Sequence, residues 1–191
     1  MRPGSPLGAA LVSLSLAFVA ACASQSVETE WERVEAPHFV CADGAFALEL
    51  PLGWMRSGQV LARDPAGNHA ISFNAGPVLT GDEALAVDAS APELMQALNE
   101  QLAAQPGVVV LACRAVALDG LPGFRAHFTQ SPPPNEASAA PLSSEHLLYG
   151  AIDGEMLFAF ALEAPAGAEF ARDLPEFEAL VASFRRLTTV P

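Results

Sequence analysis

The sequence contains no lysine, and its nine basic residues are all arginines. Phosphate-binding-loop lysines, Schiff-base lysines and Ser-Lys dyads are therefore excluded. The 22 acidic residues outnumber the basic ones and give a formal net charge of −13. A surface of this sign repels phosphate backbones and anionic lipid headgroups. The composition thus argues against nucleic-acid binding and against electrostatic adhesion to membranes.

Motifs for catalysis, metals and cofactors are also missing. The four histidines lie far apart without His-Glu-x-x-His spacing, and there is no Gly-x-Ser-x-Gly or Cys-x-x-Cys motif. We therefore predict no catalytic, metal-binding or cofactor-binding residues. The best candidates for a site assembled only in space are His127, which shares a strand face with Arg125, and His146, which follows Glu145. A solvated or packed strand position is the simpler interpretation of both histidines.

The N-terminal segment has the features of an export signal. It carries one charge, Arg2, and its apolar run from residue 11 to 21 is shorter than the roughly 20 residues that span a bilayer. The run ends in Val-Ala-Ala-Cys at 19–22, which resembles the lipobox of bacterial lipoproteins. That resemblance implies that residues 1–21 are cleaved and that Cys22 is lipidated. The alternative is an ordinary signal-peptidase site beside an incidental cysteine.

The lipobox resemblance also implies a location. The two or three acyl chains of a lipoprotein cysteine anchor it firmly, whereas one chain binds only marginally. Ala23 and Ser24 follow Cys22, without the aspartate that retains lipoproteins in the inner membrane of two-membrane bacteria. We therefore expect an envelope protein of the outer membrane that faces the periplasm. Residues 22–36 would form a tether whose end contacts the domain.

From residue 37 onward, the hydrophobic pattern predicts one α+β domain at 37–191, an antiparallel sheet flanked by helices. Two amphipathic segments begin with capping-box sequences and are expected to be helices, one near Ser90 and one at Asp173. Pro122 and Gly123 are placed as a type II turn requires. Period-2 alternation between turn-forming residues predicts strands at 38–41, 45–50, 59–63, 69–75, 108–118, 124–130, 146–152 and 156–163.

Taken in order, several motifs resemble the PsbP-like fold. They are Phe-x-Leu-x-Leu-Pro-x-Gly-Trp at 46–54, a central helix, Asp-Gly-Leu-Pro-Gly-Phe at 119–124, an aromatic hairpin and a terminal helix ending Ala-Ser-Phe at 182–184. This group includes the extrinsic PsbP subunit of photosystem II, a Ran-binding nuclear transport factor and envelope lipoproteins of the DcrB type. The resemblance implies an antiparallel sheet sandwiched between helices, and it implies no common activity.

Two cysteines remain in the predicted domain, Cys41 and Cys113, and each lies in a predicted strand. One hypothesis is a disulfide between them, because an exported protein enters an oxidising compartment. On the chain-entropy model such a bond would stabilise the fold by up to roughly 4 kcal/mol. The alternative is two buried thiols that pack as small apolar side chains.

Two functional hypotheses follow. The first is a non-catalytic binding or accessory module, anchored to the envelope, that contacts a protein partner through a sheet face, its acidic surface or the proline-rich segment 131–143. The second is a small-ligand-binding or hydrolytic domain with a pocket between sheet and helix, where Arg125, His127 and Tyr149 converge. The absence of a catalytic motif, and the resemblance to a fold used mainly for protein contacts, favour the first.

Overall fold

A computed structural model of the protein describes residues 30–41, 45–63, 69–77, 91–131, 143–154 and 156–187. The predicted signal segment, Cys22 and most of the proline-rich segment lie outside these residues. Among the helices that are described, none has the length and apolar character needed to cross a bilayer.

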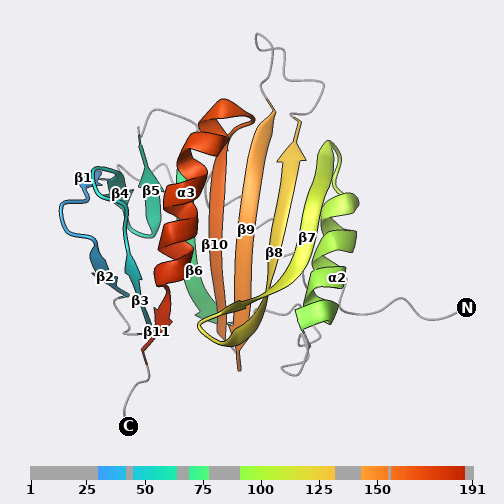
Figure 1. Ribbon diagram of the computed structural model, residues 1–191, viewed down its shortest axis with the longest axis horizontal. Helices are drawn as coiled ribbons and strands as arrows, with labels where there is room; N and C mark the ends of the chain where they lie inside the picture. The colour runs from blue at the N-terminus through green and yellow to red at the C-terminus, as the bar shows by residue number, and fades with distance from the viewer. Residues whose placement is uncertain are drawn as a thin grey trace, which may run out of the picture.

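An eight-stranded antiparallel sheet forms the centre of the domain (Figure 1). Its strand order is β1-β4-β5-β6-β10-β9-β8-β7, so β1 and β7 are the two edges. The strands are β1 (Glu32–Arg33), β4 (Met55–Ser57), β5 (Val60–Ala62), β6 (Ala70–Pro77), β7 (Val108–Leu118), β8 (Leu121–Gln130), β9 (Ser144–Asp153) and β10 (Met156–Pro165).

Two helices and a smaller sheet cover this central sheet. Helix α3 (Ala168–Ser183) and a three-stranded sheet of order β11-β3-β2 share one hydrophobic cluster with the central sheet. Helix α2 (Ala91–Ala103) packs on the other face, against β7 and β8. The short strands are β2 (His38–Val40), β3 (Phe46–Glu49) and β11 (Arg185–Arg186). The sequence correctly predicted an α+β fold with helices on both faces.

Separate hydrophobic clusters lie on the two faces of the sheet. On the α3 face, the Phe46 ring lies 6.4 Å from the Phe73 ring and 6.1 Å from the Phe158 ring, measured between centroids. On the α2 face, Leu98 and Leu102 of the helix pack against β8. Side chains alternate between faces along a strand. This alternation sends the β8 phenylalanines toward α2 and the intervening polar residues toward α3.

Helix α3 begins at Ala168, earlier than the predicted start at Asp173. Asp173 lies within the helix with a completely buried side chain, and Pro175 is an internal residue that lacks one backbone hydrogen bond. An aspartate that caps a helix and one that pairs with a distant side chain look alike in the local sequence. The capping-box pattern therefore misplaced the helix start.

The turn between β7 and β8 is also shorter than predicted. Leu118 pairs with Leu121, which leaves a two-residue loop of Asp119 (φ 49°) and Gly120 (φ 78°). Both residues are in the left-handed region, as a type I′ hairpin turn requires, and Asp-Gly is a preferred sequence for that turn. The following Pro-Gly pair belongs to β8 and does not form the predicted type II turn.

The segment predicted as a tether, residues 22–36, joins the fold near its end. Glu32 and Arg33 form β1, which pairs with β4 at the edge of the central sheet. Val34 is buried, and its backbone N–H donates to the carbonyl oxygen of Trp54 at 2.7 Å. The folded domain thus begins before residue 37.

The two cysteines of the disulfide hypothesis lie in separate hydrophobic clusters. Cys41 belongs to the cluster on the α3 face, whereas Cys113 packs against the cluster on the α2 face. The central sheet therefore separates the two side chains, a placement that favours two thiols, and the disulfide stays a prediction. Burial raises the pKa of the Cys113 thiol, so this cysteine is less acidic than an exposed one.

Candidate functional site

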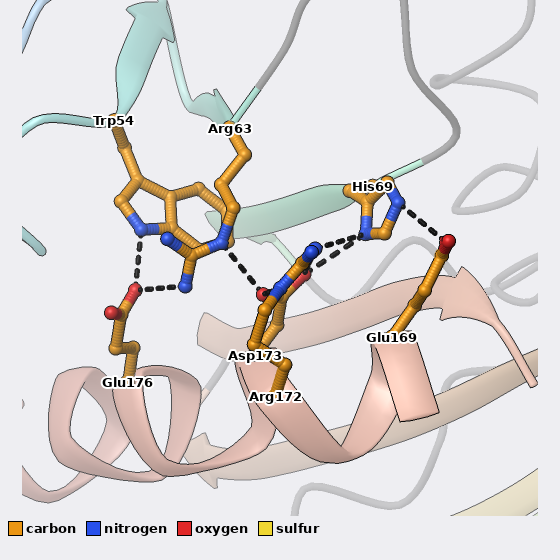
Figure 2. A network of polar contacts seen from close by, with 7 residues as sticks. All are labelled: Trp54, Arg63, His69, Glu169, Arg172, Asp173 and Glu176. Carbon is orange, nitrogen blue, oxygen red and sulfur yellow. Dashed lines mark hydrogen bonds and ion pairs between the residues drawn. The ribbon is translucent and has the colours of Figure 1, made fainter. Parts of the chain in front are cut away.

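Seven side chains connect α3 to the β4–β6 region, and we call this network the α3 clamp (Figure 2). Three acidic residues lie along one side of α3 at positions i, i+4 and i+7, a spacing that aligns side chains on one helix face. Three residues face them from the sheet, one just before β4, one just after β5 and one just before β6. The α3 clamp consists of Trp54, Arg63, His69, Glu169, Arg172, Asp173 and Glu176.

Asp173 is the centre of the clamp. Its Oδ1 accepts from Arg63 Nε at 2.7 Å and from Arg172 Nε at 2.9 Å, and its Oδ2 lies 3.0 Å from His69 Nδ1. Burial by itself would raise the pKa of Asp173, but hydrogen bonds from Arg172, Arg63 and His69 outweigh burial and hold the pKa below its usual value. Asp173 is therefore an ionised, buried carboxylate at neutral pH.

Arg63 and His69, the two partners of Asp173 from the sheet side, each contact a second carboxylate. Arg63 Nη2 donates to Glu176 Oε2 at 2.9 Å, and the same oxygen accepts from the indole N–H of Trp54. The Arg63 guanidinium lies 4.9 Å from the centroid of the Trp54 ring, within cation–π range. The other nitrogen of His69, Nε2, lies 2.8 Å from Glu169 Oε2.

The clamp holds α3 in place and is not arranged for chemistry. Both ring nitrogens of His69 face carboxylate oxygens, which accept hydrogen bonds and do not donate them. Arg172 Nη2 also lies 3.3 Å from His69 Nδ1. The two arginines and His69 of the clamp face its three carboxylates, and the network contains no hydroxyl or thiol group. The clamp is best interpreted as a positioning network.

The predicted convergence of Arg125 with Tyr149 occurs on the α3 face. Arg125 Nε donates to Tyr149 Oη at 2.9 Å, and Arg125 Nη2 lies 3.4 Å from Glu178 Oε1 of the helix. The Tyr149 ring packs against Phe177 with centroids 5.9 Å apart. An aromatic side chain of the helix thus occupies the space beside Tyr149 that a ligand pocket would need.

His127 lies on the same face but pairs with a different group. Its Nε2 is 2.7 Å from Glu145 Oε1, and its ring stacks on Phe170 of α3 at 5.4 Å. The second oxygen of Glu145 accepts from the backbone N–H of Gly167 at 3.2 Å. His127 and Glu145 therefore connect the sheet to the start of α3, in the same way as the clamp does further along the helix.

His146 lies on the opposite face in a buried position. Its side chain stacks on Phe128 with centroids 4.8 Å apart, and its Nε2 is 2.7 Å from Ser144 Oγ. Burial lowers the pKa of His146 to about 4, so the ring is neutral at pH 7. Glu163 is its cross-strand neighbour, and burial raises the pKa of that carboxyl group. The structure, which describes both residues, shows no ion pair between His146 and Glu163.

Side chains that could ligate a metal are dispersed over the described residues. No cluster of three or more His, Cys, Asp or Glu side chains is placed there to hold a metal ion. The carboxylates and the histidine of the α3 clamp are instead neutralised by one another and by arginines.

One edge of the sheet differs from these closed clusters. Strand β7 has β8 as its one neighbour among the described strands, and it carries Val109 and Leu111 with exposed fractions of 58% and 52%. Arg114 is also exposed and forms no ion pair with any described residue. We call this strand with its outward side chains the β7 edge.

Sequence reasoning found the histidines on the sheet but missed the clamp. The two partners of Asp173 on the sheet side, His69 and Arg63, lie 104 and 110 positions earlier in the chain, so no local motif contains them. The one available signal was the i, i+4, i+7 spacing of acidic residues on α3. This spacing marks a helix face without indicating what the face contacts.

No family model and no curated protein matches the chain. Solved structures do match. A crystal structure from Bacteroides thetaiotaomicron overlaps with a TM-score of 0.53 at 12% identity, covering 82% of this chain and 50% of that one. The Ran-binding protein Mog1p of Saccharomyces cerevisiae overlaps with a TM-score of 0.51 at 12% identity, covering 85% and 98%. This chain has a Mog1-like α+β fold.

The solution structure of the cyanobacterial PsbP protein of Synechocystis is a further neighbour, with a TM-score of 0.49 at 12% identity over 85% of this chain and 96% of that one. The fold assignment rests on the first two overlaps, and the chain spans only half the length of the Bacteroides protein. The PsbP-like resemblance had implied this fold, because the group includes a Ran-binding factor. Identities this low describe shape and do not transfer an activity.

Proposed function

We propose that the protein is a lipid-anchored envelope protein whose folded domain binds a protein partner and catalyses no reaction. The observation that carries the proposal is a contrast within the domain. His69, His127 and His146 are each engaged by neighbouring side chains, whereas the β7 edge exposes apolar side chains and backbone. A module that works by contact needs an open surface of this kind and does not need a reactive group.

The sequence and the fold each support part of this proposal. Lipidation of Cys22 would place the domain at the periplasmic side of the outer membrane. The tether from Cys22 to Trp31, fully extended, would reach roughly 35 Å, so the domain could meet partners away from the bilayer. Mog1p is a Ran-binding protein, which illustrates that this fold can serve protein binding.

In-cell crosslinking tests the proposal. The full-length protein and a secreted, unlipidated Cys22→Ala form are crosslinked in parallel, and bound proteins are identified by mass spectrometry. We expect one partner in near-stoichiometric amount, and less of it with Cys22→Ala. Recovery of no protein with either form would contradict a binding module. An intact mass with an unmodified Cys22 would contradict the lipid anchor separately.

The Ser144–His146 pair supports a second candidate, a weakly marked hydrolase. A serine hydroxyl 2.7 Å from a neutral imidazole is one half of a nucleophile–base arrangement. No described carboxylate pairs with His146 to complete a triad. A fluorophosphonate probe distinguishes the candidates, because a hydrolase would be labelled at Ser144 and the Ser144→Ala variant would not. Absence of labelling in the wild-type protein would remove this candidate.

A further inference from the structure

We propose that the β7 edge binds an extended, acidic segment of a partner protein, which adds a strand to the central sheet. This inference rests on the proposed function, a module that binds a protein, and specifies where and what it binds. Strand addition at a free sheet edge is an established mode of peptide recognition, in which main-chain hydrogen bonds give affinity and side chains give specificity.

The exposure of β7 shows that the rest of the described chain leaves it accessible. Although α2 packs on one face of this strand, the exposed residues form more than half of it and lie on both faces. A sheet edge presents backbone N–H and C=O groups that no neighbouring strand pairs, and it is a template for another strand. The exposed residues are Val109, Leu111, Ala112, Arg114, Ala115 and Ala117.

The pairing of β7 with β8 identifies the part of the edge that fits a new strand. The register shifts between Val110 and Ala112, which leaves Leu111 as the extra residue of a β-bulge. A bulge disrupts pairing locally, so the N-terminal part of β7 is a poor template. From Ala112 to Leu118 the register continues without interruption. This regular stretch is rich in alanine, whose small side chains let a second backbone approach closely.

The charge at the edge selects the chemistry of the occupant. Arg114 lies directly opposite Arg125 on β8, and like charges in this position destabilise a sheet. Arg125 is balanced by Glu178, whereas Arg114 has no acidic partner among the described residues. A carboxylate on an added strand next to Arg114 would supply the missing counter-charge. We therefore assign an acidic residue to that position of the partner segment.

The same charges disfavour a second copy of this chain as the occupant. Antiparallel pairing of β7 with its own copy would bring a second Arg114 to the edge instead of the carboxylate that Arg114 lacks, and like charges on paired strands destabilise a sheet. We therefore do not expect a dimer that pairs through β7, and finding one in the test below would overturn the proposal.

Site-specific photocrosslinking in cells tests the inference. Benzoylphenylalanine is placed in the full-length protein at one of two positions. The first is Leu111 on β7, and the second, for comparison, is Leu52, which is 62% exposed and precedes β4. Mass spectrometry then identifies the crosslinked peptide of the partner. We expect Leu111 to capture a segment that contains Asp or Glu, and Arg114→Glu to reduce that product at least tenfold. The matched control Arg33→Glu, an exposed arginine on the opposite edge strand, should leave it unchanged.

Amide hydrogen exchange provides a readout specific to strand pairing. A synthetic peptide that copies the captured segment is added to the protein, and exchange is followed along β7. We expect every second amide from Ala112 to Leu118 to exchange at least tenfold more slowly, because only outward-facing N–H groups pair with the new strand. Uniform protection or none would show that the segment contacts side chains only, which would overturn strand addition.

The outcomes separate this inference from the proposed function. Partner capture from Leu52 but not from Leu111 would overturn the β7 edge and leave a binding module in place. Capture by Leu111 of this same chain, or of a segment insensitive to Arg114→Glu, would overturn the acidic partner segment. If neither position captures a protein, the β7 edge is overturned, and the binding function is then decided by the whole-protein crosslinking described above.

Discussion

Lowering the pH should destabilise the folded domain through His146. Burial lowers the pKa of this histidine from 6.5 to about 4. The unfolded chain therefore binds one more proton than the folded chain between those two pH values. Stability contributed by the neutral ring is present above pH 6.5 and is lost as the pH falls toward 4. A pKa difference of one corresponds to about 1.4 kcal/mol, so the full effect is about 3 kcal/mol.

The assay is urea-induced unfolding of the secreted, unlipidated protein at several pH values from about 7.5 to about 4.5, compared with a His146→Gln variant. Between these limits we expect the wild-type free energy of unfolding to fall by about 2.5 kcal/mol more than that of the variant. Glutamine does not titrate, and every other titrating group is shared by both proteins.

The comparison with the variant matters because Glu163 acts in the opposite direction. Burial raises the pKa of this carboxyl group, so its protonation stabilises the folded state as the pH falls. The wild-type curve alone would therefore underestimate the effect of His146. Parallel pH dependence in the two proteins would refute the reasoning, because it would mean that the ring titrates alike in the folded and unfolded states.

Three further predictions concern the remaining features. Asp173→Ala should lower the free energy of unfolding by about 2–3 kcal/mol in the same urea assay, because it leaves the partners of a buried carboxylate unpaired. Arg172→Ala should leave the free energy of unfolding nearly unchanged, because this side chain is half-exposed. Equal effects of the two substitutions would contradict the central role of Asp173. Gly150→Ala should lower the free energy of unfolding by about 1–3 kcal/mol, because the added Cβ would lie 2.3 Å from the Phe124 ring. Gly154→Ala should lower it by about 1 kcal/mol, because the space around its Cβ is open and only the positive φ of 58° is unfavourable for alanine. Under denaturing conditions without reductant, both cysteines of the folded domain should take up a thiol label, and an unlabelled mass would indicate a disulfide.

The layers of the fold were predictable because hydrophobic periodicity is a local property. The β8 residues from Phe124 to Phe128 alternate apolar and polar side chains, and this pattern alone indicates both the strand and the residues on each of its faces. The β9–β10 hairpin around Asp153 was predictable for the same reason. Locally ambiguous signals were the ones that failed, such as the capping-box sequence at Asp173.

The candidate sites depended much more on the tertiary structure. The sequence placed Arg125 and His127 on one strand face and proposed Tyr149 beside them. The structure pairs Arg125 with Tyr149, and it pairs His127 with Glu145, which the sequence had placed only next to His146. The α3 clamp was not predictable, because its two halves lie more than 100 positions apart. Side chains this distant in sequence meet only when the sheet and the helix have packed.

The sequence alone thus determined the absence of lysine chemistry, the acidic charge, both helices and most of the strands, all of which are properties of composition or of local periodicity. The export signal stays a prediction. The tertiary structure decided three things that local patterns do not encode. It separated Cys41 from Cys113 across the sheet, buried Asp173 against Arg63 and His69 from distant segments, and left β7 with a single neighbour among the described strands. Strand order specifies which strand lacks a neighbour, and that order is fixed by long-range pairing.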